Sequence, residues 1–225
     1  MYKAFFFDMD GVLFNSMPHH AQAWEIVMKK YNLNFTARDT YLQEGRTGQD
    51  VIEECYRTKY NAEPPTDLVW KIYEEKTNLF HQLGDTSPIP GVKEVLAYLQ
   101  QLPSQPQIWI VTGSGQQTLF AQLEETFPSV FKREQMVTAY DVKHGKPNPE
   151  PYLRAWKQSG CDKKDCMVIE NAPLGIRAGK QAGLFTVGVN TGILHKEDLL
   201  KEGADKVFDS MSELLCFLQS LNDAL

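Results

Sequence analysis

Two acidic residues close the most apolar stretch near the start of the chain. In "KAFFFDMDG" three phenylalanines precede Asp8 and Asp10, and Gly11 follows them. The apolar run has the length and composition of a buried strand, so the two carboxylates are expected at its exposed end. Gly11 lets the backbone turn away sharply after them. The segment therefore predicts an acid pair at one edge of a sheet.

Three other segments place polar side chains after an apolar run or in a turn. "IWIVTGSG" ends in Thr112 and Ser114, "CMVIENAPLG" contains Glu170 and Asn171, and "HGKPNPE" presents Lys146 before a proline. In an open parallel sheet, ligands bind beyond the carboxyl ends of the strands. We therefore expect these side chains to meet the acid pair in one site.

Together these residue types suit phosphoryl transfer. The oxygen atoms of Asp8, Glu170 and Asn171 match the preference of Mg²⁺ for hard ligands. Thr112, the backbone amides after it and Lys146 would stabilise negative charge on phosphate oxygens. The simpler alternative is that some of these residues cap turns and helices, a role that is compatible with phosphate binding at a helix N-terminus.

Apolar runs of strand length alternate with helical patterns along most of the chain. The runs are "KAFFFD", "QIWIVT", "MVTA", "CMVIE", "FTVGV" and "DKVF". Helical periodicity follows in "GVKEVLAYLQQL", "QQTLFAQLEETF", "NPEPYLRAWKQSG" and "APLGIRAGKQAG". This alternation predicts an α/β fold with a doubly wound, Rossmann-like and mostly parallel sheet.

The long segment after the first predicted strand has a different character. Between residues 17 and 84 several stretches show apolar residues at helical spacing, and none shows a convincing strand pattern. We therefore predict an all-helical cap domain, residues 16–84, inserted into a core domain that comprises residues 1–15 and 85–225. The "FNSMP" and "LGDTSPIPG" segments are the expected hinges.

Composition excludes several classes of protein. The chain has 225 residues, is 42% hydrophobic and carries a formal net charge of −6, with its 23 Lys and Arg residues scattered, so nucleic acid is not an expected partner. The cysteines form no C-x-x-C pair and are expected to be reduced. The apolar start is too short for a membrane span and resembles no secretion signal. A soluble, cytoplasmic monomer without membrane contact is expected.

Four motifs occur in order and attached to the predicted strands: "DMDGVLFNS", "VTGSG", "KPNPEPY" and "VIENAPLGIRAGKQAG". With a helical cap inserted after the first, the chain resembles the haloacid dehalogenase superfamily of aspartate-nucleophile phosphotransferases over essentially its whole length. It is most similar to the β-phosphoglucomutase-like branch. Any one motif alone would be weak, and the four together are specific.

The resemblance implies a covalent mechanism. Asp8 would attack phosphorus and form an aspartyl-phosphate, while Asp10 would protonate the leaving oxygen and later deprotonate water. Thr112 and Lys146 would be catalytic. The implied Mg²⁺ ligands are the side chains of Asp8, Glu170 and Asn171 and the backbone carbonyl of Asp10. A raised pKa is predicted for Asp10 when the cap is closed.

The segment "QEGRTG" is the sharpest feature of the cap. Two glycines flank Arg46 and Thr47 in a turn that could approach a ligand closely, and Arg46 could bind a phosphate through its planar fork. A solvent-facing turn with an incidental ion pair is the alternative. Asn15 at the hinge and His20 in the cap leave active-site and structural roles equally open. The candidate substrate-binding residues are Asn15, His20, Glu44, Arg46, Thr47, Gly113 and Ser114.

Two positions depart from the pattern of this branch. Its sugar-phosphate mutases carry a lysine where Glu44 falls and an aspartate where Asn171 falls. We therefore hypothesise that Glu44 reaches the Mg²⁺ shell when the cap closes, which leaves little room for a hexose bisphosphate. The favoured function is a Mg²⁺-dependent phosphohydrolase acting on inorganic pyrophosphate or a small phosphomonoester. The alternative is a β-phosphoglucomutase, which interconverts β-glucose 1-phosphate and glucose 6-phosphate. A receiver-like signalling module is opposed by the cap and by the D-x-D spacing.

Overall fold

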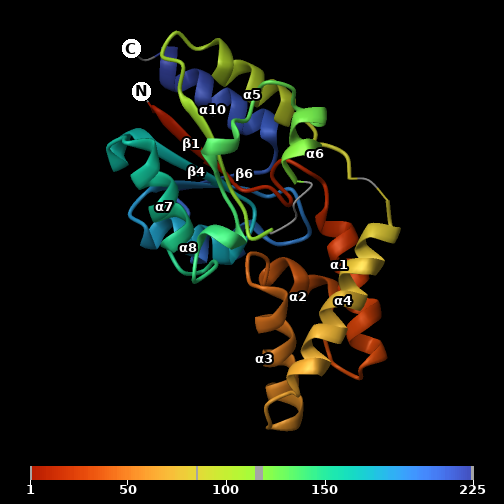
Figure 1. The fold of residues 1–225 in the computed structure, drawn as a ribbon. Coiled ribbons are helices and arrows are strands. Elements are labelled where there is room, and N and C mark those ends of the chain that lie inside the picture. Colours follow the sequence, from red (N-terminus) through yellow and green to blue (C-terminus); the bar gives the residue numbers. More distant parts are fainter. Residues whose placement is uncertain (1, 85, 115–118, 224–225) are drawn as a thin grey trace.

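A parallel sheet lies at the centre of the structure (Figure 1). The computed structural model describes residues 2–84, 86–114 and 119–223. Their strands are β1 (Ala4–Phe7), β2 (Gln107–Val111), β3 (Met136–Val137), β4 (Cys166–Glu170), β5 (Phe185–Val189) and β6 (Lys206–Phe208). The order is β3-β2-β1-β4-β5-β6 with parallel neighbours throughout, which confirms the predicted fold class.

The strand β1 occupies the position at which the strand order reverses. Phe7 is level with Ile110 of β2 and with Ile169 of β4. The chain therefore leaves the sheet at neighbouring points, with Asp8 after β1 and Thr112 after β2, beside the end of β4. In doubly wound sheets this switch point is where ligands bind.

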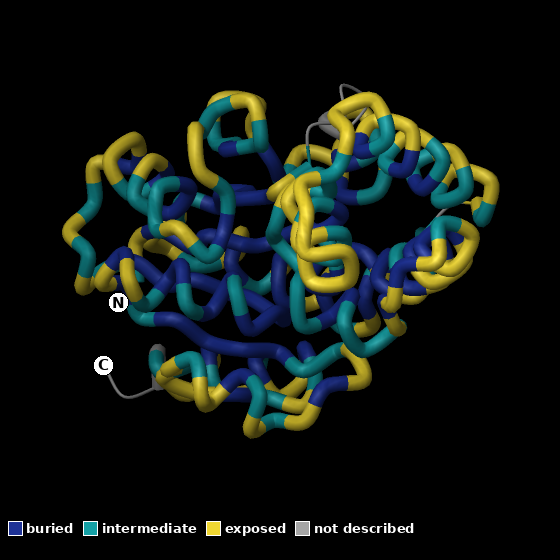
Figure 2. Tube along the Cα trace, turned by 90° about the horizontal axis from the view of Figure 1, so that it is seen from below, coloured by how far each residue is buried: buried dark blue, intermediate teal, exposed yellow. Residues whose placement is uncertain are grey.

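The phenylalanines of β1 alternate between the hydrophobic cores on the two faces of the sheet. Phe5 and Phe7 belong to one core and Phe6 to the other. The first core is covered by α5 (Val92–Gln101), α6 (Leu119–Thr126) and α10 (Met211–Asp223), and the second by α7 (Glu150–Ser159) and α8 (Pro173–Gln181). Figure 2 shows the buried residues concentrated along the strands in the middle of the molecule.

Shorter elements complete the core. They are α9 (Lys196–Lys201) and single 3₁₀ turns at Arg133–Gln135, Ala139–Asp141 and Lys163–Asp165. The helix expected from Asn148 begins at Glu150, because Asn148 Oδ1 instead accepts a hydrogen bond from the Glu150 amide at 2.9 Å. The helix expected from residue 116 lies partly outside the described residues, and its described part is α6.

Four helices gather beyond one end of the sheet (Figure 1). They are α1 (Met17–Lys30), α2 (Ala37–Leu42), α3 (Gly48–Tyr60) and α4 (Thr66–Gln82). They share a hydrophobic cluster of their own, which includes Trp24, Met28, Ile52 and Ile72. These helices span the segment in which a cap is predicted. The exact division at residues 15/16 and 84/85 stays a prediction, and residues 1, 85 and 225 that bound it lie outside the described residues.

The length and polarity of the helices show whether any of them could span a membrane. Within residues 2–84, 86–114 and 119–223, every helix is too short or too polar to cross a bilayer.

Candidate active site

The carboxyl edge of the sheet brings together the core residues predicted from the motifs. Asp8, Thr112, Lys146, Glu170 and Asn171 are all buried there. The Lys146 ammonium donates to Asp8 Oδ1, to Glu170 Oε1 at 2.6 Å and to the Val111 carbonyl at 3.0 Å. Lys146 therefore connects the acid after β1 with the acid at the end of β4.

Burial and charge pairing act in opposite directions on the pKa values of Asp8 and Lys146. Burial raises the pKa of Asp8 to about 8, and the neighbouring Glu170 adds to the rise while the Lys146 charge opposes it. Burial alone would lower the pKa of Lys146, but the carboxylates of Asp8 and Glu170 outweigh it and the pKa is raised. Lys146 therefore keeps its positive charge beside Asp8 at neutral pH.

Asp10 lies in a separate network with residues of α1 and α4. Ser16 donates to Asp10 Oδ1 at 2.5 Å, and His20 Nε2 lies 3.5 Å from the same oxygen. The other ring nitrogen of His20 is 2.7 Å from Lys76 Nζ, and the ring stacks on Phe80 with centroids 4.1 Å apart. If the Lys76 ammonium donates a hydrogen bond to Nδ1, neutral His20 carries its proton on Nε2, and this N–H is directed at Asp10.

The raised pKa predicted for Asp10 is wrong for this structure. Burial raises that pKa, but hydrogen bonding and charge from His20, the Ser16 hydroxyl and the charge of Lys76 outweigh burial and leave it lowered. The sequence prediction was tied to closure of the cap and did not include the contacts of Asp10 with His20 and Lys76, which depend on how α1 packs against α4. Asp10 is therefore ionised at neutral pH.

Lys76 gives a first testable prediction. The side chain is buried, and burial lowers its pKa to about 8 from the ordinary 10.5 despite the Asp10 charge. Between these values the unfolded chain binds more protons than the folded protein, so stability rises with pH through that window and is lost as pH falls through 8. Lys76→Met should therefore raise the melting temperature at pH 7, by about 2–4 °C for each kcal/mol gained, and the gain should shrink by pH 10.5. A lower melting temperature at pH 7 would contradict this.

Three buried oxygen atoms in the described part of the site have no hydrogen-bond partner: Asp8 Oδ2, Glu44 Oε1 and Asn171 Oδ1. Glu44 belongs to the cap, and its other oxygen accepts from the Asn171 side-chain amide at 2.9 Å. Burial and the charges of Asp8 and Glu170 raise the pKa of Glu44 well above its ordinary value. Unpartnered oxygens of this kind fit a hard divalent cation. The described residues contain no group of three or more His, Cys, Asp or Glu side chains suited to a metal, and this donor set includes an amide.

Glu170 is committed to other partners. Its Oε1 accepts from Lys146 and from the Tyr152 hydroxyl, and its Oε2 accepts from the amides of Asn171 at 3.2 Å and Ala172 at 3.4 Å. In this structure Glu170 therefore anchors Lys146 and is not open to a cation in the way that Asn171 is.

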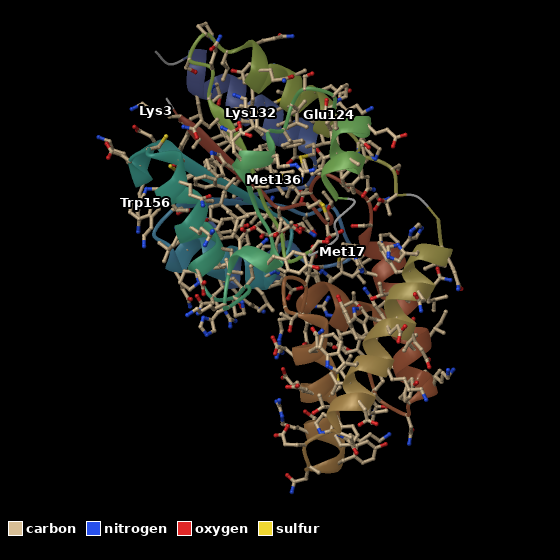
Figure 3. All side chains as sticks on the ribbon, viewed as in Figure 1. Lys3, Met17, Glu124, Lys132, Met136 and Trp156 are labelled. Carbon is tan, nitrogen blue, oxygen red and sulfur yellow. The ribbon has the colours of Figure 1, made fainter. Side chains whose placement is uncertain are left out.

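The loop before α3 packs against the core at Gly45. Gly45 has φ +93°, and a Cβ there would lie 3.0 Å from Lys146 Cβ. Its carbonyl oxygen lies 3.4 Å from where a Cβ of Gly113 would stand and 3.5 Å from that of Gly145. A cavity of about 100 Å³, partly open to solvent, lies beside this contact. It is lined by Gly45 and Thr47 of the cap and by Thr112, Gly113, Lys143 and Lys146 of the core, among others. The side chains at this junction are drawn in Figure 3, where Met17 marks the start of α1.

Gly45→Ala is expected to disfavour this closed contact. A side chain at positive φ and in contact with Lys146 costs on the order of 1–3 kcal/mol, so kcat/KM should fall by about 5- to 150-fold. Gly160→Ala is the matched control, since Gly160 also has positive φ, at +67°, but has open space around it. Equal activity losses in the two variants, measured as initial rates, would argue against a role of the Gly45 contact.

Of the remaining predicted residues, Ser114 and Thr47 lie beside the site, whereas Arg46 and Asn15 are not directed at the Asp8 cluster. The Ser114 amide donates to Thr112 Oγ1 at 3.0 Å, and Thr47 accepts from the Asp50 amide as the N-cap of α3. Arg46 instead pairs with Glu54 and donates to Gln43 at 3.1 Å, so the structure does not direct it at the Asp8 cluster. The Asn15 side chain is exposed at the hinge. The ion pair of Arg46 matches the alternative interpretation of "QEGRTG", whereas the turn itself packs on the core at Gly45 and does not face solvent there.

Sequence reasoning missed Ser16, Lys76 and Tyr152. One signal was present for Lys76, which follows Val69 and Ile72 by seven and four residues and so falls on the apolar face of its helix. A lysine on such a face needs a buried partner. Ser16 and Tyr152 are the last residues of the "DMDGVLFNS" and "KPNPEPY" motifs, but their partners are defined only by the folded geometry.

Comparison with known proteins agrees with this arrangement. Residues 2–183 match the model of the haloacid dehalogenase-like hydrolases, and the chain belongs to that family. It is 29% identical to 2-deoxyglucose-6-phosphate phosphatase 1 of Saccharomyces cerevisiae over 92% of this chain and 87% of the relative. It is 25% identical to the beta-phosphoglucomutase of Bacillus subtilis over 94% and 91%.

The similarity extends to solved structures. A Bacteroides vulgatus protein named provisionally as a beta-phosphoglucomutase superimposes with a TM-score of 0.93 at 42% identity, covering 100% of this chain and 90% of that one. The resemblance to the β-phosphoglucomutase-like branch inferred from the four motifs is therefore confirmed.

Proposed function

We propose that the protein is a Mg²⁺-dependent phosphohydrolase with Asp8 as nucleophile, acting on inorganic pyrophosphate or a small phosphomonoester. The observation that carries this proposal is the placement of Asp8. One of its oxygens is held by the charged Lys146, and the other is buried without a hydrogen-bond partner. Once Asp8 is ionised, which a cation at its unpartnered oxygen would favour, a carboxylate oriented in this way can attack an electrophile.

The residues then divide the reaction into two steps. In the first step the Asp8 carboxylate forms a bond to phosphorus as the bond to the leaving oxygen breaks. In the second step Asp10 takes a proton from water, which attacks phosphorus and releases phosphate from Asp8. Thr112, the amides after it and Lys146 stabilise the phosphoryl oxygens throughout.

The ionisation of Asp10 affects which leaving groups can depart in the first step. Its lowered pKa keeps Asp10 in the ionised form that can accept a proton from water, but makes it a poor proton donor in the first step. A departing phosphate is a far weaker base than an alkoxide and leaves without being protonated. Pyrophosphate is therefore the substrate whose cleavage depends least on proton donation by Asp10.

The unpartnered oxygens of Asp8, Asn171 and Glu44 are the side-chain atoms that would hold Mg²⁺. The family resemblance adds the Asp10 backbone carbonyl. When bound, the ion would neutralise charge on the phosphoryl oxygens. Glu170, committed to Lys146 and Tyr152, would contribute by fixing the lysine.

The cap contacts favour a small substrate. Glu44 places a carboxylate against Asn171, Gly45 packs on Lys146, and Arg46 is engaged by Glu54. A second phosphate on a sugar would thus find neither an available Arg46 nor much space. The names of the relatives, which include several sugar phosphate phosphatases, keep small phosphomonoesters within the proposal.

A β-phosphoglucomutase is the second candidate, favoured by the 42% identity to the Bacteroides vulgatus protein. Turnover with Mg²⁺ on pyrophosphate, sugar phosphates, nucleotide monophosphates and β-glucose 1-phosphate with a trace of the bisphosphate separates the two. Phosphate release led by pyrophosphate or a small monoester supports the hydrolase. Glucose 6-phosphate formed without free phosphate would replace it with the mutase.

A further inference from the structure

Tyr152 is a fully buried tyrosine of α7 whose hydroxyl the proposed chemistry does not use. The hydroxyl donates to Glu170 Oε1 at 2.5 Å. The same oxygen accepts from Lys146 Nζ at 2.6 Å. Tyr152 therefore shares one acceptor atom with the lysine that contacts Asp8.

The Glu170 carboxylate is held on its other sides as well. Its Oε2 accepts from the amides of Asn171 and Ala172, which fixes one end of the group. Helix α8 also packs closely against the carboxylate, since a Cβ on Gly175 would lie only 2.1 Å from Glu170 Cδ. The direction of Oε1 thus depends on its two remaining donors, the Tyr152 hydroxyl and the Lys146 ammonium.

Tyr152 also contacts Lys146 directly. The ammonium lies 5.1 Å from the centroid of the Tyr152 ring, within the range of a cation–π contact. One tyrosine therefore touches both members of the Lys146–Glu170 pair, through its hydroxyl and its ring. Such fixed outer contacts orient charged groups that act on a ligand.

We propose that Tyr152 is a positioning residue, whose hydroxyl orients Glu170 so that the Lys146 ammonium is directed at Asp8. Tyr152 itself does not touch the substrate. The inference rests on the proposed phosphohydrolase function, because it assigns the role by which Lys146 stabilises the transferred phosphoryl group.

Tyr152→Phe tests the proposal because it removes one hydroxyl and keeps the ring contact with Lys146. A hydrogen bond to a charged group contributes about 1.5–3 kcal/mol, so kcat should fall by about tenfold or more, while KM changes little. Tyr31→Phe is the matched control. The Tyr31 hydroxyl donates to Glu75 at 2.7 Å and Lys30 donates to the same carboxylate at 2.7 Å, a similar tyrosine–carboxylate–lysine group on the cap surface. Its activity should equal that of the unaltered protein.

A double-mutant cycle with Glu170→Gln separates positioning from a general loss of packing. If Tyr152 acts through Glu170, adding Tyr152→Phe to Glu170→Gln should cost less than about twofold in kcat. Full multiplication of the two losses would overturn the proposal, as would a Tyr152→Phe enzyme with unchanged kcat.

Crystal structures of both tyrosine variants give a readout that does not depend on activity. In Tyr152→Phe the Lys146 ammonium should leave its contact with Asp8, and in Tyr31→Phe it should remain. An unchanged Lys146 in Tyr152→Phe would overturn the proposal. If the unaltered protein released phosphate from no substrate while the ammonium moved as expected, the proposed function would fail and the structural role of Tyr152 would stand.

Discussion

Asp8→Asn is expected to lose at least about a thousandfold in kcat on every phosphorylated substrate, because the amide has the size of the carboxylate but cannot attack phosphorus. The fold should persist, since Lys146 keeps its hydrogen bonds to Glu170 and to the Val111 carbonyl. Phosphate release measures the effect. Asp67→Asn on the exposed start of α4 is the control and should have full activity.

The same variant makes a prediction about stability. The pKa of Asp8, raised to about 8 from 3.8, means that the folded protein holds a proton which the unfolded chain has lost between these values. Stability from this group is present at low pH and is lost as pH rises through 8. In metal-free protein, Asp8→Asn should therefore melt at least as high as the unaltered protein at pH 8, and its relative advantage should shrink toward pH 4. A variant that melts lower at pH 8 would contradict the burial argument.

Glu44→Ala is expected to lower kcat/KM for pyrophosphate by about 100-fold or more, as for a buried charged group removed from a site, and to cost far less for an artificial aryl phosphate. The reason is that Glu44 supplies an unpartnered oxygen and a hydrogen-bond acceptor for Asn171. Pyrophosphate brings more charge to the metal than an aryl ester does, so it depends more on a complete set of ligands.

Two further measurements sharpen the Glu44 prediction. The affinity for Mg²⁺, measured by calorimetry, should fall by about tenfold or more in Glu44→Ala. Glu53→Ala, which removes a half-buried partner of Arg57 on α3, is the matched cap control and should change neither quantity. Equal losses on the two substrates with unchanged Mg²⁺ affinity would exclude a role of Glu44 at the metal.

The sheet could be predicted because its strands are apolar runs with abrupt polar ends. Each of the six runs identified in the sequence overlaps a strand, and Phe5 to Phe7 alternate between two cores as period-two geometry requires. Asp8 and Thr112 follow their strands directly and Glu170 ends β4, so strand order alone was enough to bring them together. Placing Lys146 with them relied on the motif rather than on strand geometry.

The cap side of the site was harder to predict. The partners Lys76 and His20 are separated by 56 residues, and their contact depends on how α1 packs against α4. Arg46 has the residue type of a phosphate ligand, but the turn of α3 brings Glu54 within reach and pairs it there. The pKa of Asp10 was predicted with the wrong sign for the same reason, since its direction is set by these cap contacts. The expected monomer and cytoplasmic location stay predictions.

The most direct test of the central claim is to trap the covalent intermediate. Enzyme mixed with Mg²⁺ and radiolabelled substrate should be quenched with acid within the first turnover, digested and analysed by mass spectrometry. The account predicts label on the peptide that contains Asp8, removable by hydroxylamine as an acyl phosphate should be, and none in Asp8→Asn. Release of labelled phosphate from an active enzyme with no label at Asp8 would contradict the account.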